Sequence, residues 1–258
     1  MLNKTIKCIS VILSILLLLT SKGYADTPLV VLDAGHGGID SGAISPDGQF
    51  IEKIWNLETT ESCKKTLEKY DVDVILTREG DIFLSLAERK QIANSADVSV
   101  SIHYNATKNH KGAYGLIIGG NVEGSTELAH SIRDELLKVR DNVQVWEDNS
   151  YYAMTNLKVP CVIVETTFID NPNDSKYADT LKERQIIGER IAYGILNYLG
   201  VDTSQTDLTK DISQVNKTDK VNKVDVKKSL SIIDRIKNRF KSARSNNKVQ
   251  YIRDLILN

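Results

Sequence analysis

The sequence lacks several patterns that mark common protein classes. It has three cysteines in 258 residues, too few for a small secreted scaffold held together by disulfides. Neither GxGxxG nor a GxxxxGKS or GxxxxGKT run occurs, so a nucleotide site is not expected. We find no internal repeat and no nucleic-acid motif. With 41% hydrophobic and 26% charged residues, the composition is that of a globular protein long enough for a full core.

Long hydrophobic runs are also missing, except near the first residue. Lys4 and Lys7 precede an apolar run over residues 9–19, and Gly23-Tyr24-Ala25 follows it. A basic head, a short apolar middle and a small-residue end predict a secretory signal peptide over residues 1–25. An uncleaved membrane anchor is the alternative, but the run is short for a bilayer span. We therefore expect an exported protein.

Cleavage of that segment removes Cys8 and leaves two cysteines. Cys63 lies in a segment of helical period, and Cys161 opens an apolar run. Both positions are typical of buried thiols. A disulfide between Cys63 and Cys161 is the alternative that the sequence leaves open.

Positive charge is concentrated at the C-terminal end. The formal net charge is −1, yet from Val201 onward 13 Lys or Arg face 7 Asp. Residues 201–228 are polar and read as a linker. In residues 229–258, Leu230, Ile233 and Phe240 recur at helical spacing among basic residues, which predicts a basic amphipathic tail. The tail is either a solvated helix packed loosely on the main domain or a docking element for an anionic polymer, a membrane surface or a partner protein.

Between these ends, short β-branched runs alternate with segments of helical period. The pattern predicts a single α/β domain over residues 26–200 with a mostly parallel sheet covered by helices on both faces. The expected strands are 29–32, 72–76, 98–102, 115–118, 143–146 and 162–164, and the expected helices are 55–70, 84–96, 125–140 and 181–199.

Polar residues with metal-binding chemistry follow three of the predicted strands. His36, His103 and Glu165 come directly after the first, third and sixth strands, and Glu52 precedes the first helix. Because the carboxyl ends of parallel strands meet at one edge of a sheet, these side chains are expected at the same rim. Glu165 follows Val162-Ile163-Val164, where a carboxylate without a partner is costly to bury.

Two imidazoles and a carboxylate form an open zinc site when His36, Glu52 and His103 are the ligands. Such a site polarises an amide carbonyl and acidifies water, and a further carboxylate, Glu165, can move protons. Each residue also has an ordinary reading: the histidines as loop hydrogen-bonders and Glu52 as a favourable charge at a helix N-terminus. His110 in a polar turn and His130 within a helix are expected to be solvated.

Several ordered blocks together resemble the zinc-dependent N-acetylmuramoyl-L-alanine amidases of bacterial cell walls. The resemblance spans about residues 29 to 199. The blocks are VVLDAGHGGIDSGA, then Glu52-Lys53 before a helix, then ILTREGDIFLSLAERKQIANSADVSVSIHYNA and VPCVIVETTFIDNPNDSKYAD.

The resemblance implies a single α/β domain with a six-stranded sheet and one zinc ion held by His36, Glu52 and His103. It implies that Glu165 is the catalytic acid/base. The reaction implied is hydrolysis of the amide between the lactyl group of N-acetylmuramic acid and the first L-alanine of the stem peptide. The expected location is outside the membrane, secreted or in the cell wall or spore envelope.

Other residues of the blocks have less defined roles. Arg78 and Glu88-Arg89 are expected in salt bridges or in contacts with the substrate peptide, and Asp33 and Asn105 are candidates for orienting the ligands. Thr166-Thr167 departs from the small residue or glycine familiar after the catalytic glutamate, which puts the fit of the substrate in question.

Two other functions are consistent with the residues: a zinc peptidase cutting within the stem peptide, and a non-catalytic peptidoglycan-binding protein. As an amidase, the protein could act in autolysis, in sporulation or germination, or against competitors. No wall-binding repeat is recognisable, so targeting is expected from the catalytic domain, the basic tail or an activating protein partner.

Overall fold

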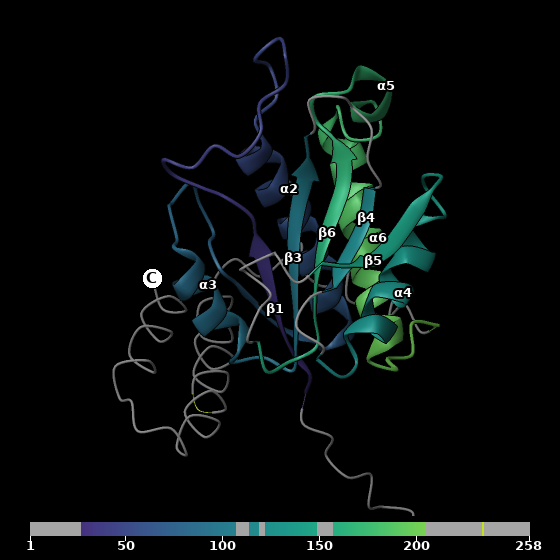
Figure 1. The fold of residues 1–258 in the computed structure, drawn as a ribbon. Helices are drawn as coiled ribbons and strands as arrows, with labels where there is room; N and C mark the ends of the chain where they lie inside the picture. Colours follow the sequence, from purple (N-terminus) through teal and green to yellow (C-terminus); the bar gives the residue numbers. More distant parts are fainter. Residues whose placement is uncertain (1–26, 107–113, 119–121, 149–156, 205–233, 235–258) are drawn as a thin grey trace, which may run out of the picture.

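The computed structural model describes residues 27–106, 114–118, 122–148, 157–204 and 234 (Figure 1). Within these ranges, no helix has the length and apolar character needed to cross a membrane. The predicted signal peptide, His110, nearly all of the linker and the basic tail except Asp234 lie outside the described residues.

Six strands form one sheet in the order β2-β1-β3-β6-β4-β5. β2, β1, β3 and β6 run parallel to one another, β4 pairs antiparallel with β6, and β5 runs parallel to β4. The predicted α/β class with a mostly parallel sheet is thus confirmed. The strands are β1 (Leu29–Ala34), β2 (Asp73–Leu76), β3 (Val98–Asn105), β4 (Tyr114–Ile118), β5 (Val143–Glu147) and β6 (Cys161–Phe168).

The helices begin and end where local chemistry favours it. Capping boxes start two of them, with Ser85 paired to Glu88 and Thr180 paired to Glu183, and Gly200 adopts a left-handed conformation just beyond the last helix. The helices are α2 (Glu52–Leu67), which continues into the short 3-10 helix η1 (Glu68–Tyr70), α3 (Leu86–Ala93), α4 (Ser125–Leu136), α5 (Pro172–Ser175) and α6 (Leu181–Tyr198).

Several predicted boundaries are wrong. The strands predicted to end at residues 102 and 164 continue to Asn105 and Phe168, so His103 and Glu165 lie within paired strands rather than after them.

The bounds of three helices also differ from the prediction. Glu52 is the first residue of α2 rather than a residue before the helix, because its charge is favourable in a first turn. The predicted helix over 84–96 is shorter, since the Ser85 cap sets its start and Asn94 ends it. α4 ends at Leu136, whereas the prediction extended to 140.

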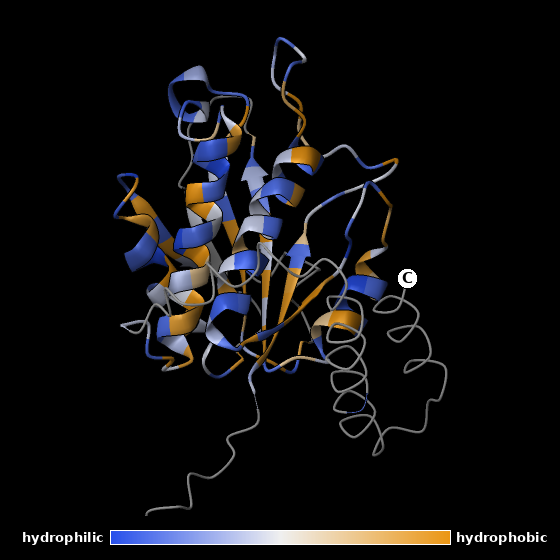
Figure 2. Cartoon of the chain, turned by 180° about the vertical axis from the view of Figure 1, so that it is seen from behind, coloured by the Kyte–Doolittle hydropathy of each residue, from blue (hydrophilic) through white to orange (hydrophobic). Residues whose placement is uncertain are grey.

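Helices cover both faces of the sheet, as expected. α2, α6 and α4 pack on one face, and α3 lies against β1 on the other (Figures 1 and 2). Along β1, Val30 and Leu32 enter the main core, whereas Asp33 contacts Arg89 of α3. This alternation puts the polar network of β1 on the α3 side.

The two described cysteines are free and buried. Cys63 of α2 belongs to the main core, and Cys161 of β6 packs with Ala93 and Ile163 on the opposite face. The sheet separates the two thiols, so the disulfide that the sequence left open does not form.

Candidate metal centre

The predicted site residues gather at one rim of the sheet, where β1, β3 and β6 end. His103 pairs with Glu165 across the β3–β6 ladder, and Ala34 pairs with Ile102 across β1–β3. His36 follows β1 by two residues, and α2 brings Glu52 to the same rim. The expectation that these four residues share an edge is confirmed, because the three strands are parallel neighbours.

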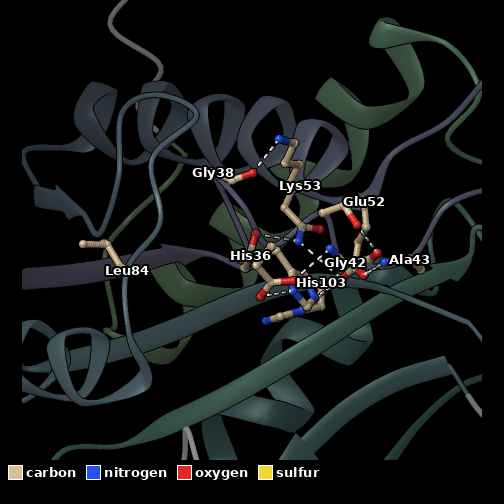
Figure 3. A network of polar contacts seen from close by, with 12 residues as sticks. His36, Gly38, Gly42, Ala43, Glu52, Lys53, Leu84 and His103 are labelled. Carbon is tan, nitrogen blue, oxygen red and sulfur yellow. Dashed lines mark hydrogen bonds and ion pairs between the residues drawn. The ribbon is translucent and has the colours of Figure 1, made fainter.

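Glu52 lies between the two imidazoles (Figure 3). Its Oε1 is 3.1 Å from His36 Nε2 and 3.0 Å from His103 Nδ1. The backbone N–H groups of Ala43 and Tyr104 donate to its two oxygens at 2.8 and 3.2 Å. One donor atom from each of the three side chains lies within 4.8 Å of the others. The carboxylate is therefore held in place by backbone donors while it faces both rings.

The ionisation of this cluster favours positive charge. Burial opposes protonation of His36, but hydrogen bonds and negative charge from Glu52 and Asp40 outweigh it and raise the His36 pKa to about 9. Burial likewise opposes protonation of His103, yet Glu52 raises its pKa overall. Burial would raise the pKa of Glu52, but the two histidines lower it well below its usual range. An environment that stabilises two imidazolium charges also suits a divalent cation.

Glu165 stands apart from this hydrogen-bonded cluster. It is buried, and within the described part of the chain its Oε2 has no hydrogen-bond partner. Burial raises its pKa to about 7, although the positive charge of His103 and His36 acts in the opposite direction. A buried carboxyl oxygen without a hydrogen-bond partner is unusual in native proteins. It indicates a group that binds a ligand or takes part in a reaction.

Two buried arginines fix the backbone that carries His36. Arg78 donates to the carbonyls of Ala34 and Gly35 at 2.9 and 3.0 Å, and Arg89 donates to those of Ala34 and His36 at 2.8 and 2.6 Å. His36 itself has a φ of 59°, a left-handed conformation that is uncommon for a residue with a Cβ. The hydrogen bonds from the two arginines therefore stabilise the strained backbone segment that carries His36.

One of the expected salt bridges is confirmed, that of Arg89, whereas Arg78 donates to backbone carbonyls instead; the expected contacts with a substrate peptide stay a prediction. Arg89 forms a buried ion pair with Asp33, 2.6 Å from Nη1 to Oδ1, and Arg78 reaches backbone carbonyls. Glu88 caps α3. Asp33 also accepts from Thr77 and Ser101, so it supports the loop through Arg89 and contacts neither histidine by a hydrogen bond.

Glycines give the rings room. A Cβ on Gly35 would lie 2.2 Å from the His103 ring, and one on Gly42 would lie 2.5 Å from Glu52 Oε2 and 2.6 Å from His36 Cδ2. The backbone must therefore pass directly against both ligand candidates, which only glycine allows. Gly42 additionally has a φ of 62°.

The structure adds two residues that the sequence reasoning missed. Asp40 Oδ2 lies 2.8 Å from His36 Nδ1, and Asn56 Nδ2 donates to the Gly35 carbonyl at 3.0 Å and to Glu52 Oε1 at 3.4 Å. The i+4 spacing of a carboxylate from a candidate ligand histidine was the available signal for Asp40. His130 is exposed, as expected.

The donor set fits zinc. Two imidazole nitrogens and one carboxylate oxygen converge from separate elements, and three protein ligands leave a coordination position for a reactant. The orphaned oxygen of Glu165 supplies a fourth polar group at the same rim that forms no hydrogen bond to the three.

Comparison with known proteins gives consistent matches over this domain. A family model described as N-acetylmuramoyl-L-alanine amidase matches residues 30–197. The chain is 30% identical over 231 residues to N-acetylmuramoyl-L-alanine amidase AmiA of Salmonella typhimurium, with 70% of this chain and 80% of the relative covered.

Solved structures agree. The CwlD amidase from Clostridioides difficile, in complex with the GerS lipoprotein, matches with a TM-score of 0.64 and 31% identity, over 68% of this chain and 100% of that chain. The catalytic domain of CwlV, an amidase from Bacillus (Paenibacillus) polymyxa var. colistinus, matches with a TM-score of 0.63 and 26% identity, over 68% and 100%.

Proposed function

The chain belongs to the N-acetylmuramoyl-L-alanine amidase family, and we propose that His36, Glu52 and His103 hold a zinc ion beside Glu165 as the catalytic acid/base. The reaction is hydrolysis of the amide between the lactyl group of N-acetylmuramic acid and the L-alanine that begins the stem peptide. The observation that carries the assignment of roles is the contrast between the two glutamates. Glu52 is fixed between two imidazoles, whereas Glu165 is buried and its Oε2 has no hydrogen-bond partner among the described residues.

Zinc in this site supplies Lewis acidity, which polarises a carbonyl and makes water easier to deprotonate. The chain's own residues supply the rest. Glu165 accepts a proton from the attacking water and returns it to the alanine nitrogen as the C–N bond breaks. In the metal-free protein, burial raises its pKa to about 7, which favours the protonated form that the second transfer needs.

The loop residues keep the candidate ligands in place while protons move. Arg78 and Arg89 hold the carbonyls behind His36, and the Ala43 and Tyr104 N–H groups fix Glu52. Thr166, where a small residue or glycine is familiar, is buried and donates from Oγ1 to the His103 carbonyl at 3.2 Å. This hydroxyl therefore supports the β3–β6 rim from within.

The test is a digest of purified peptidoglycan by zinc-loaded protein, with new L-alanine N-termini counted by mass spectrometry. Glu165→Gln is expected to lower the rate by about 10²- to 10⁴-fold while bound zinc stays equimolar. Glu127→Gln, an exposed position on α4, is the matched control and should digest at the wild-type rate.

Four results would contradict parts of this proposal. Wild-type rates from Glu165→Gln would remove the acid/base assignment, and activity that survives exhaustive chelation would remove the metal. Fragments cut inside the stem peptide would instead identify a zinc peptidase. Zinc-free protein that binds peptidoglycan without cleaving it would indicate a non-catalytic binding protein.

We further infer that the protein works outside the membrane, as an autolysin or a spore-cortex amidase. The substrate is a cell-wall polymer, and the similar CwlD was solved with a lipoprotein bound, which supports an activating protein partner for this chain too. Digests of vegetative and of spore peptidoglycan by the same preparation separate the two roles by their relative rates.

A further inference from the structure

We propose that Asp40 is a positioning residue of the metal centre, fixing the His36 ring so that Nε2 is the atom offered to the metal. The inference rests on the proposed zinc site. Of the three candidate ligands, Asp40 forms a hydrogen bond with His36 and with neither Glu52 nor His103, so its direct contact with the site is at the His36 ring.

A tight turn delivers the Asp40 carboxylate to the ring. Gly37 and Asp40 exchange two backbone hydrogen bonds of 2.8 and 3.1 Å, and Gly38 between them has a φ of 59°. The turn folds the Asp40 side chain back so that Oδ2 lies 2.8 Å from His36 Nδ1, while Oδ1 accepts from the Gly42 N–H at 3.1 Å. Both oxygens are thus engaged within one loop, and the carboxylate cannot rotate away without losing a contact.

The chemistry of the pair selects one form of the ring. A carboxylate only accepts hydrogen bonds, so the proton of the neutral imidazole is placed on Nδ1. In the metal-free structure Nε2 lies 3.1 Å from Glu52 Oε1 and donates to it when protonated. A metal ion would take the place of that proton, so Nε2 would become the ligand atom while Nδ1 keeps its hydrogen bond to Asp40. A metal-binding histidine commonly gives its other N–H to a carboxylate, which fixes the tautomer and increases the basicity of the ligand atom.

His36 needs this support more than His103 does. His103 extends from the last part of β3, and its ring lies directly over Gly35, where even a Cβ would come within 2.2 Å. The two side chains are about equally exposed, 25% for His36 and 21% for His103, and a glycine lies against each ring. They differ in backbone, because His36 lies on a loop with positive φ, so the Asp40 hydrogen bond adds a constraint that the strand already gives His103.

The Asp40 side chain is 46% exposed, so its pair with His36 contributes little to folding. Removing it is therefore expected to change the site more than the stability of the domain. This separation makes the role measurable.

The experiment measures the zinc dissociation constant of the full chain by competition with a chromophoric chelator. The variants are Asp40→Ala, Asp40→Asn and the control Asp47→Ala. Asp47 lies in the same connection before α2 and accepts from Ser45 and Gln49, with no contact to the site. Thermal melts of the metal-free proteins establish that each variant folds.

Asp40→Ala is expected to weaken zinc binding by about 10- to 100-fold. Asp40→Asn should fall between it and the wild type, because an amide oxygen can still accept from Nδ1. Asp47→Ala should bind as the wild type does. In zinc-loaded wild-type protein, long-range ¹H–¹⁵N NMR should show a proton on His36 Nδ1 that exchanges slowly, and Asp40→Ala should lose this slow exchange.

Zinc binding by Asp40→Ala within twofold of the wild type overturns the inference, as does an equal loss in Asp47→Ala. If the wild-type protein binds no zinc at all, both the proposed function and the proposed role of Asp40 are wrong. Wild-type protein that binds zinc while Asp40→Ala binds equally well leaves the proposed function intact and removes only the role of Asp40.

Discussion

At the scale of single residues, two glutamates at one rim have opposite environments. Glu52 accepts from two backbone N–H groups and two imidazoles, and its pKa is lowered. Among the described residues Glu165 Oε2 has no hydrogen-bond partner, and burial raises the Glu165 pKa to about 7. A carboxylate that stays ionised suits a ligand, and one that titrates near neutrality suits proton transfer. The difference comes from what surrounds each side chain.

The Glu165 pKa predicts how metal-free protein responds to pH. The folded value of about 7 lies above the ordinary 4.5, so the folded state binds the proton more tightly. The associated stability is fully present below pH 4.5 and is lost as the pH rises through 7, with an upper limit of about 3 kcal/mol. Glu165→Gln stays neutral and should lose that much less stability between pH 4.5 and 8.

Urea unfolding with a chelator present, at pH 4.5, 6 and 8, measures this difference. Glu127→Gln on the exposed face of α4 is the control and should follow the wild type at every pH. Parallel pH profiles for wild type and Glu165→Gln would contradict the raised pKa.

At the scale of elements, the connection from β1 to α2 is shaped around the site. Arg78, Arg89 and Asn56 hold three successive carbonyls, those of Ala34, Gly35 and His36. Two side chains hydrogen-bond the Gly38 backbone. Lys53 Nζ donates to the Gly38 carbonyl at 2.9 Å, and the Gly38 N–H donates to Asp81 Oδ1 at 2.7 Å. The glycines allow the backbone conformation of the loop, and the side-chain hydrogen bonds then hold the loop in that conformation.

Two glycines of this loop provide a matched test of that statement. Gly42 and Gly48 both have positive φ, 62° and 74°, but a Cβ on Gly48 meets nothing within 4 Å, whereas one on Gly42 collides with Glu52 and His36. Each change to alanine should cost about 1–2 kcal/mol from the left-handed backbone. Only Gly42→Ala should also weaken zinc binding, by about tenfold or more.

Denaturant unfolding and chelator competition on the two variants measure both effects. Equal zinc affinities for Gly42→Ala and Gly48→Ala would show that the close approach at Gly42 does not constrain the ligands.

At the scale of the whole molecule, the catalytic domain and the basic tail are separable in the sequence. The buried hydrophobic residues of the described chain lie between Leu29 and Leu196, and the family match covers residues 30–197. The 13 basic residues against 7 acidic ones from Val201 onward lie beyond both. The chemistry therefore belongs to the domain, and the tail stays one of three candidates for targeting, beside the domain itself and a protein partner.

Removal of residues 205–258 is the corresponding prediction. Activity on soluble muropeptides should stay within about twofold of the full chain, because the described core and site are retained. Sedimentation with insoluble cell wall should fall. The fall should be clearest at low salt, where attraction between opposite charges is least screened. In the full chain, replacing Arg235, Lys237 and Arg239 by Gln should reproduce the binding loss. Unchanged wall binding in both proteins would exclude the tail as the docking element.

The sequence by itself determined the α/β class, the approximate positions of strands and helices, and the candidate set His36, Glu52, His103 and Glu165, because hydrophobic periodicity and strand-end polar residues are local patterns. Tertiary structure decided what depends on contacts between distant segments. It made Arg78 and Arg89 supports of the loop, kept Cys63 and Cys161 on opposite faces and ran β4 antiparallel to β6. It also left one oxygen of Glu165 without a hydrogen-bond partner in the part of the chain that the structure describes. Pairing direction, burial and pKa arise only when the chain has folded, since each is set by neighbours that are remote in sequence.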